Sequence, residues 1–333
     1  GVTVCKVADL ISQGLKQAKK SKAKAKAKGK AKPKLCRMVT GFSSQAGAAG
    51  LLHGAAPVDY DVGGIALLII DPQKDFHEGG SLAVAGASED SKRIAEVLRD
   101  YELDIERVVV TLDTHHAMHI HNSFFWADAE GKHPESFTII SKQDVEEGKW
   151  KARQSEMQAW ALEYVGKLEA GKSGLPMCIW PPHCLLGTTG HAVHDPLMDA
   201  LSTWAVSRAR SINWYFKGQN NRTEMYSALK SEVEVPDDPT TSLDMELIRF
   251  LARHNKVICC GEAMSHCVNW TVRHLLSAWP TKRTGDIVLL EDCASPVNGF
   301  EAAADKFKQD MRKSGVTVCK AASLPELLGL QRK

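Results

Sequence analysis

Short apolar runs alternate with segments of helical period from residue 61 onward, and this alternation limits the fold more than any other feature. The apolar runs read IALLII, RVVVTL, SINWYF, KVICCG, DIVLLED and GVTVC. Amphipathic stretches lie between them at residues 90–101, 243–254, 267–278 and 299–313. Apolar strands that are buried on both faces and separated by helices predict a mostly parallel sheet. The helical connections between parallel strands cross over the sheet in a right-handed sense. We therefore expect a doubly wound α/β domain, a Rossmann-like three-layer fold with helices on both faces.

A lysine-rich tract precedes this pattern. Ten lysines fall within residues 16–34, whereas the whole chain has a formal net charge of only +2, so all other residues together sum to −8. Lysines repel one another and offer little apolar surface to bury, so we expect residues 16–60 to be a linker and loop that is disordered in part. The tract has no interleaved aromatic residues and no nucleic-acid-binding fold beside it, so we do not expect a nucleic-acid partner.

The cysteines and the hydropathy pattern indicate the compartment. The nine cysteines are scattered without disulfide-like spacing, and a bridge between the adjacent Cys259 and Cys260 would be strained. We therefore expect reduced thiols and a cytoplasmic, intracellular protein. The chain has no uncharged apolar run of about 18 residues, so we expect no membrane span. The first residues also lack the apolar segment of a secretory signal.

Polar side chains follow four of the apolar runs. Asp71, Asp113 and Lys217 each come directly after a run, and the segment Glu262–Cys267 follows the fourth. Ligands bind beyond the carboxyl ends of the strands in an open parallel sheet. An Asp after a strand is usually a helix cap and a Lys is usually solvated. However, a carboxylate, a metal-binding type of pair in Asp113 and His115, an ammonium and a thiol at one rim together favour an active site.

Cys267 is the candidate nucleophile. It lies in GEAMSHCVNWTVRHLL, where a helix is expected to begin near Ser265. A thiol in a first helical turn faces free N–H groups and the positive end of the helix dipole, so we expect its pKa to be lowered. The same N–H groups can form an oxyanion hole. The alternative is a buried, inert cysteine.

Ligands for a metal ion occur in two segments. Asp113 and His115 lie two residues apart on one side of an extended segment, and the motif WPPHC supplies His183. A carboxylate and two imidazoles suit zinc, iron or manganese and leave positions open for water or substrate. Three further histidines crowd the same region, and one of them is a candidate fourth ligand. They are His116, His119 and His121.

Five motifs, in this order along the chain, resemble those of the nicotinamidases and the wider isochorismatase-like cysteine hydrolases. They are IIDPQKDFHEGGSLAV, DTHHAMHIHNSF, WPPHCLLGTTG, FKG and GEAMSHCV. The resemblance extends over about residues 61–325. The first and third motifs are its most specific parts. It implies an isochorismatase-like fold for this domain.

The resemblance implies a catalytic triad of Asp71, Lys217 and Cys267. It also implies a cis peptide bond before Ala263 and an oxyanion hole made by the N–H groups of Ala263 and Cys267. In this reading Asp71 takes the thiol proton, Lys217 balances charge, and the thiolate attacks an amide carbon.

The resemblance further implies a metal cofactor and an aromatic substrate. Asp113, His115 and His183 would hold a divalent ion, with zinc the first candidate and iron or manganese the others. Phe76 and Trp180 would enclose an aromatic ring of a small-molecule amide. We expect the chain to convert nicotinamide and water to nicotinate and ammonia through a cysteine thioester, and to form a homo-oligomer.

One departure from the family is an insert. A short segment usually joins the metal-binding loop to WPPHC, whereas here residues 122–179 intervene, and residues 153–170 have the apolar spacing of a helix with a buried face. The insert could cover the site or form an interface. Two alternatives therefore stay open: another small amide or ureido hydrolase of the superfamily, and a non-catalytic scaffold member of the fold.

The two ends of the chain share a short repeat. Residues 1–6 and residues 315–320 both read GVTVCK, and the second copy is expected to be the last strand of the α/β domain. We interpret residues 1–15 as the tail of an upstream copy and the chain as one unit of a tandem array. Residues 61–333 would then form the hydrolase domain. A chance match is the alternative.

Overall fold

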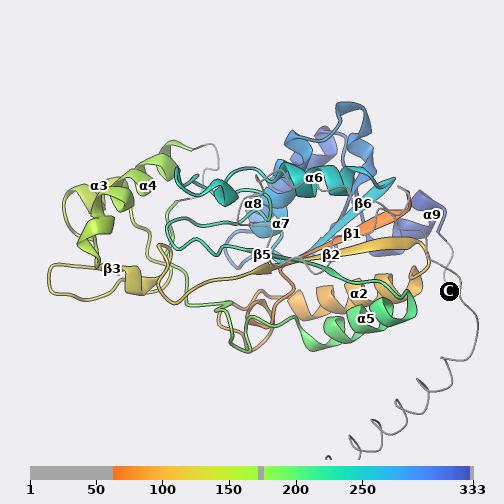
Figure 1. Ribbon diagram of the computed structural model, residues 1–333, viewed down its shortest axis with the longest axis horizontal. Coiled ribbons are helices and arrows are strands. Elements are labelled where there is room, and N and C mark those ends of the chain that lie inside the picture. Colours follow the sequence, from red (N-terminus) through yellow and green to blue (C-terminus); the bar gives the residue numbers. More distant parts are fainter. Residues whose placement is uncertain (1–62, 172–175, 331–333) are drawn as a thin grey trace, which may run out of the picture. The chain divides into compact units, whose positions relative to one another are not determined.

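A six-stranded parallel sheet forms the centre of the protein in the computed structural model, which describes residues 63–171 and 176–330 (Figure 1). The strand order is β5-β2-β1-β6-β7-β8, and every neighbouring pair is parallel. The strands are β1 Ile65–Ile70, β2 Ile105–Asp113, β5 Asn213–Lys217, β6 Lys256–Gly261, β7 Ile287–Leu290 and β8 Thr317–Cys319. Each lies within or overlaps an apolar run found in the sequence.

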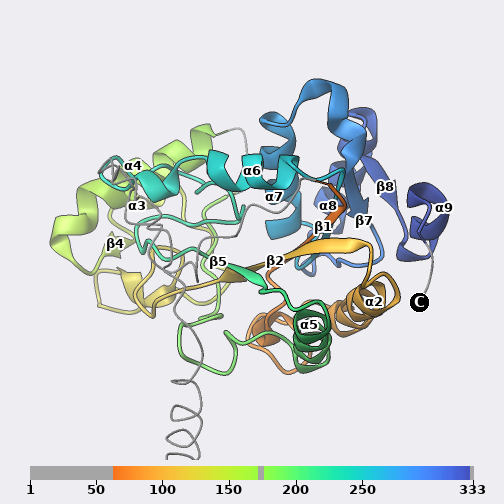
Figure 2. The same ribbon diagram turned by 45° about the vertical axis from the view of Figure 1, so that its right-hand side comes forward.

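Helices cover both faces of this sheet. On one face α2 and α5 lie side by side, and on the other lie α6, α7 and α8 (Figure 2). These helices are α2 Ala87–Asp100, α5 Asp195–Ser207, α6 Met245–Ala252, α7 Cys267–Ser277 and α8 Glu301–Lys313. The short α9 Leu324–Leu328 follows β8. The predicted doubly wound, three-layer α/β fold is therefore confirmed.

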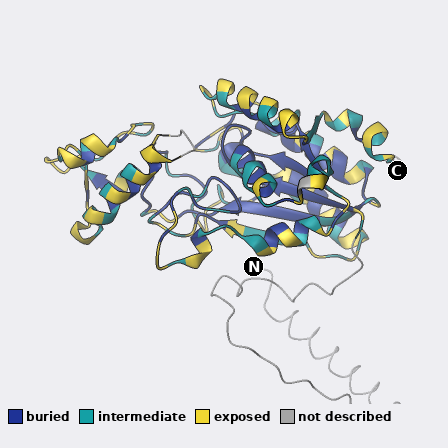
Figure 3. Cartoon of the chain, turned by 90° about the horizontal axis from the view of Figure 1, so that it is seen from above, coloured by how far each residue is buried: buried dark blue, intermediate teal, exposed yellow. Residues whose placement is uncertain are grey.

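Strand β1 shows why an uninterrupted apolar run is needed at the centre. Its six residues are all buried, and alternate side chains point to opposite faces. Leu67 packs in the cluster under α2 and α5, whereas Leu68 packs in the cluster under α6, α7 and α8. Figure 3 shows the resulting pattern of a buried sheet beneath helices with exposed outer faces.

The end strands of the sheet differ from the sequence prediction. All six runs were expected to be buried on both faces, but β5 and β8 are edge strands whose residues are mostly half-buried. Phe216 in β5 is 37% exposed. An edge strand has a neighbour on one side only, so its apolar residues do not need two complete layers of cover.

A smaller assembly lies beside the carboxyl ends of the strands, within the predicted insert. Strands β3 Trp126–Ala127 and β4 Lys151–Ala152 pair in antiparallel fashion. Helices α3 Lys142–Glu146 and α4 Gln158–Ala170 pack with them around a separate apolar cluster that includes Trp126. Met157 and Trp160 of the predicted helical stretch contact this cluster. The division of the chain into domains and an insert stays a prediction.

The remaining elements are short 3-10 helices, of which η7 is kinked at Arg283. They are η3 Lys74–Phe76, η4 Ser123–Phe125, η5 Ser155–Met157, η6 Pro239–Thr241, η7 Thr281–Asp286 and η8 Ala321–Ser323. Among the described residues, every cysteine is a free thiol, and no helix is long and apolar enough to cross a membrane. The predictions for residues 1–15 and 16–60 fall outside the described residues.

Candidate active site and metal centre

Four parallel strands deliver polar side chains to one rim of the sheet. Asp113 and Lys217, the last residues of β2 and β5, are register partners. Asp71 directly follows β1, and its backbone adopts a left-handed φ of 45° that is uncommon for a non-glycine residue. Its N–H donates to the Thr111 carbonyl at 3.1 Å. Neighbouring strands in register therefore bring the predicted carboxylates and ammonium together.

Lys217 connects two of the predicted carboxylates. Its Nζ lies 2.9 Å from Asp71 Oδ2 and 2.9 Å from Asp113 Oδ1, and it donates to the Met225 carbonyl at 2.7 Å. Burial disfavours the charged ammonium, but Asp113 and Asp71 outweigh this effect and raise the pKa of Lys217 well above its usual value. Lys217 is therefore cationic at neutral pH and neutralises part of the buried negative charge.

The two carboxyl groups that contact Lys217 have opposite pKa shifts. Burial raises the pKa of Asp71, and the charge of Lys217 only partly offsets it. Burial alone would also raise the pKa of Asp113, but the positive charges of His115 and Lys217 outweigh burial, so the pKa of Asp113 is lowered. Asp71 is therefore the better proton acceptor and donor of the two, while Asp113 stays ionised.

Cys267 is the first residue of α7 and is only 6% exposed. The helix begins two residues later than expected. The expectation of a lowered pKa is wrong: burial raises the pKa of the Cys267 thiol well above its usual value, and the charge of Lys217 only partly offsets it. The negative charges of Asp71 and Asp113 add to the effect of burial, so the charge of Lys217 does not compensate for the loss of solvent around a thiolate. The thiol is therefore protonated at rest and needs a base to become a nucleophile.

Gly261 and a cis peptide shape the loop before Cys267. Gly261 has a φ of 111°, and a Cβ there would lie 2.0 Å from the carbonyl oxygen of Ile70. Only glycine permits this approach between β6 and the end of β1. The Glu262–Ala263 peptide bond is cis, as the resemblance implied. Ala263 and Cys267 line the same cavity.

Asp113, His115 and His183 form a group of buried side chains that could hold a metal ion. Asp113 Oδ2 lies 3.2 Å from His183 Nε2, and Asp113 Oδ1 lies 3.5 Å from His115 Nε2. His183 Nδ1 donates to the Pro181 carbonyl at 2.8 Å, which leaves the lone pair of Nε2 free for an ion. A carboxylate and two imidazoles within ligand reach of one another fit a divalent ion.

The pKa of His115 depends strongly on the charged groups around it. Burial disfavours its charged form, but Asp113 and Glu224 outweigh this effect and raise its pKa to about 9. A divalent ion would compete with this proton, because a ligating imidazole must be neutral.

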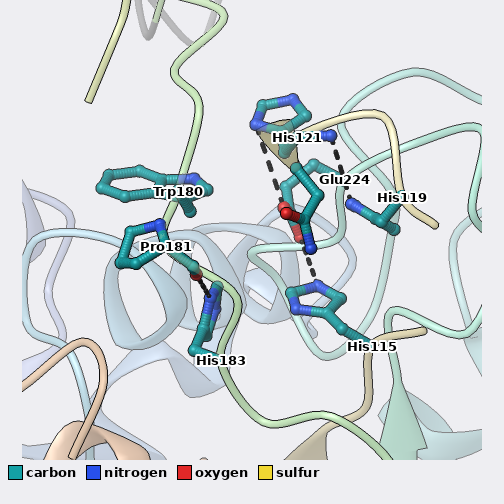
Figure 4. Close-up of a pocket in the computed structure, with 8 residues that line it drawn as sticks. His115, His119, His121, Trp180, Pro181, His183 and Glu224 are labelled. Carbon is teal, nitrogen blue, oxygen red and sulfur yellow. Dashed lines mark hydrogen bonds and ion pairs between the residues drawn. The ribbon is translucent and has the colours of Figure 1, made fainter. Parts of the chain in front are cut away.

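Of the three further histidines, two point into this region and one does not. His116 is exposed, whereas His119 and His121 are buried beside His115 (Figure 4). Sequence reasoning did not find Glu224, which is 2% exposed and has Oε1 3.2 Å from His115 Nε2. Glu224 lies in an irregular segment after β5 with neither strand nor helix period, so no pattern marks it.

A cavity of about 30 Å³ lies between the metal-type group and Cys267. Phe76, Trp180 and Tyr226 supply its aromatic wall. Trp180 Nε1 donates to the Tyr226 hydroxyl at 3.0 Å, which fixes the indole, and the Phe76 ring lies 5.5 Å from the ring of His183. The cavity is therefore bounded by a thiol, candidate metal ligands and aromatic rings.

Comparisons with known proteins find relatives that are named nicotinamidases. No family model matches the chain. The nicotinamidase of Saccharomyces cerevisiae is 24% identical over 256 residues, which are 76% of this chain and 97% of that protein. The nicotinamidase of Escherichia coli is 29% identical over 210 residues, which are 62% and 74% of the two chains.

Solved structures show the same fold. A nicotinamidase/pyrazinamidase from Acinetobacter baumanii matches with a TM-score of 0.53 and 22% identity over 78% of this chain and 98% of its own. The yeast nicotinamidase bound to the inhibitor nicotinaldehyde matches with a TM-score of 0.54 and 20% identity over 77% and 99%.

Proposed function

We propose that this chain, which belongs to the nicotinamidase and isochorismatase-like superfamily, is a cysteine amidohydrolase. Its reaction converts nicotinamide and water to nicotinate and ammonia. The observation that carries the proposal is the contact of Lys217 with both Asp71 and Asp113, each at 2.9 Å, beside a cavity lined by Cys267. Lys217 thus bridges Asp71, the proposed base for Cys267, and Asp113, a candidate metal ligand. The relatives that are named nicotinamidases support the choice of reaction.

The first half of the reaction forms a thioester. Asp71 removes the thiol proton of Cys267, and the thiolate attacks the amide carbon. The N–H groups of Ala263 and Cys267 donate to the oxygen of the tetrahedral intermediate, and such donors contribute about 3–4 kcal/mol each. Asp71 then protonates the leaving nitrogen, the C–N bond breaks and ammonia departs. The raised pKa of Asp71 suits a group that both accepts and returns a proton.

The second half releases the acid. Asp71 takes a proton from a water molecule that attacks the thioester carbon, and the C–S bond breaks. The thiol of Cys267 is restored with that proton. Throughout, Lys217 remains protonated and balances the negative charge that moves between Asp71 and Cys267.

Asp113, His115 and His183 would hold a divalent ion, and we propose zinc because a carboxylate with two imidazoles is a frequent zinc set. When bound, the ion supplies a Lewis acid that orients a heteroaromatic ring through its nitrogen. Phe76 and Trp180 would pack against the ring of the substrate. Both features favour a small heteroaromatic amide over an aliphatic one.

Ammonia release from nicotinamide by the purified chain tests the activity. Cys267→Ala should lower kcat by about 10³-fold or more, because the covalent step is lost. Cys319→Ala removes a half-buried thiol in β8 and should leave kcat unchanged. If the wild-type chain hydrolysed ureido compounds or aliphatic amides but not nicotinamide, the substrate would be one of those compounds instead of nicotinamide. No turnover of any amide would favour a non-catalytic member of the fold.

A further inference from the structure

A second group of buried ligand-type side chains lies next to the first metal-type group. His115 and His119 come from the segment after β2, and Glu224 comes from the segment after β5. Their ligand atoms all lie within 4.8 Å of one another. They line a cavity of about 10 Å³, close to the volume that one water molecule or ion requires (Figure 4).

Backbone contacts set the tautomer of His119. Its Nε2 lies 3.0 Å from the Thr223 carbonyl, so Nε2 carries the proton and donates. The lone pair is then on Nδ1, which accepts a hydrogen bond from the His121 backbone N–H at 3.2 Å. An ion bound at Nδ1 would replace this hydrogen bond. A backbone carbonyl that fixes the second ring nitrogen is a regular feature around ligating histidines.

Unpartnered polar atoms point into the same cavity. Glu224 Oε1 accepts from the Met225 N–H at 2.8 Å, but Oε2 is buried without a hydrogen-bond partner. His121 Nδ1 is also buried without a hydrogen-bond partner, and it lies 3.9 Å from that oxygen. A buried carboxylate oxygen without a partner is costly, and a cation in the cavity would satisfy it.

Charge and geometry limit how many ions this region can hold. Among the described residues that are buried in this region, Lys217 carries the one ammonium beside Asp71, Asp113 and Glu224. One divalent ion therefore balances the set when all three carboxyl groups are ionised. Moreover, Nε2 of His115 is the atom close to both carboxylates, at 3.5 Å from Asp113 and 3.2 Å from Glu224. One imidazole nitrogen has one lone pair, so it cannot ligate two ions at once.

We propose that His115, His119 and Glu224 form a second position for the divalent metal ion, which shares His115 with the Asp113–His115–His183 position and is occupied in alternation with it. The proposal rests on the proposed function only in assuming that first position. An ion in the second position contacts the segment after β2 through His119 and the segment after β5 through Glu224, and it leaves Asp113 and His183 free.

Metal content tests the proposal without substrate. The full chain is stripped with a chelator, incubated with excess zinc, desalted and measured for zinc per chain. His183→Gln removes a ligand of the first position alone, and His119→Gln removes a ligand of the second alone. Wild type and each single variant should bind about one ion, because one complete position remains. The double variant should retain no zinc after desalting, because neither position keeps its full set of ligands.

Two results would overturn the proposal. One is a His183→Gln chain that binds no zinc, and the other is a double variant that still binds one ion. Glu224→Gln combined with His183→Gln repeats the test through another ligand, should the first pair fail to fold by circular dichroism. His116→Gln is the matched control, because His116 is exposed beside the cluster. Ammonia release is not part of the readout, so failure of the proposed activity would be seen separately.

Discussion

Glu262 is a buried carboxyl group immediately before the loop of Cys267. It is 1% exposed, its Oε2 accepts from the Ser295 N–H at 3.2 Å, and its Oε1 has no hydrogen-bond partner. Burial, followed by the negative charge of Asp90, raises the pKa of Glu262 well above 4.5. Arg93 ion-pairs with Asp90 at 2.6 Å and only partly offsets this effect. The folded state therefore holds the proton of Glu262 more tightly than the unfolded state.

This shift predicts a pH dependence of stability that Glu262→Gln removes. Because the folded pKa is the higher one, the stabilisation is complete below about pH 4.5 and is lost as pH rises through the folded pKa. The loss is at most about 1.4 kcal/mol for each pH unit of that window. Relative to wild type, the Gln variant should gain stability between pH 5 and pH 8 in urea unfolding. The exposed Glu96→Gln should show no such gain, and parallel curves for wild type and Glu262→Gln would contradict the assignment.

Strand β1 is the element on which the rim depends, because it lies between β2 and β6 and leads directly to Asp71. Its side chains belong to both apolar clusters of the sheet. A cavity opened at Leu67 is surrounded by strands and helices that cannot all move inward, so the packing loss is not recovered.

Leu67→Ala should therefore destabilise the fold by about 2–5 kcal/mol, the range for buried Leu to Ala changes. The exposed Leu103→Ala, at 63% exposure, should change the free energy of unfolding by less than about 0.5 kcal/mol. Chemical denaturation of both variants measures the difference. Equal effects would mean that the central strand contributes no more than surface packing.

The elements also show what can be predicted from sequence and what cannot. The apolar run before Asp71 and the amphipathic segment after Glu262 predicted β1 and α7 because strand and helix periods are local properties. The raised pKa of Cys267 and the position of Glu224 were not predicted. Both depend on how completely distant segments bury a side chain, and Glu224 lies where no period exists.

At the scale of the molecule, the described residues contain all the candidate site residues. The sheet begins at Ile65, and the proposed catalytic and metal-binding side chains lie between Asp71 and Cys267. The lysine tract at residues 16–34 lies before the first strand and carries the opposite charge to the remainder of the chain. We therefore propose that the α/β domain functions without the residues that precede it.

Deletion of residues 1–60 should leave kcat and KM for nicotinamide within about two-fold of the full chain, because no interaction of the proposed transition state is removed. Zinc content per chain and the unfolding midpoint should also be unchanged. The matched control replaces the ten lysines of residues 16–34 by Gln in the full-length chain, which separates charge from length. A severe loss of turnover on deletion but not on lysine replacement would show that an N-terminal segment is needed to complete the active protein. The GVTVCK copy at residues 1–6 is a candidate, because it could pair with a sheet edge of another copy of the chain. Loss in both variants would assign the requirement to the basic charge itself.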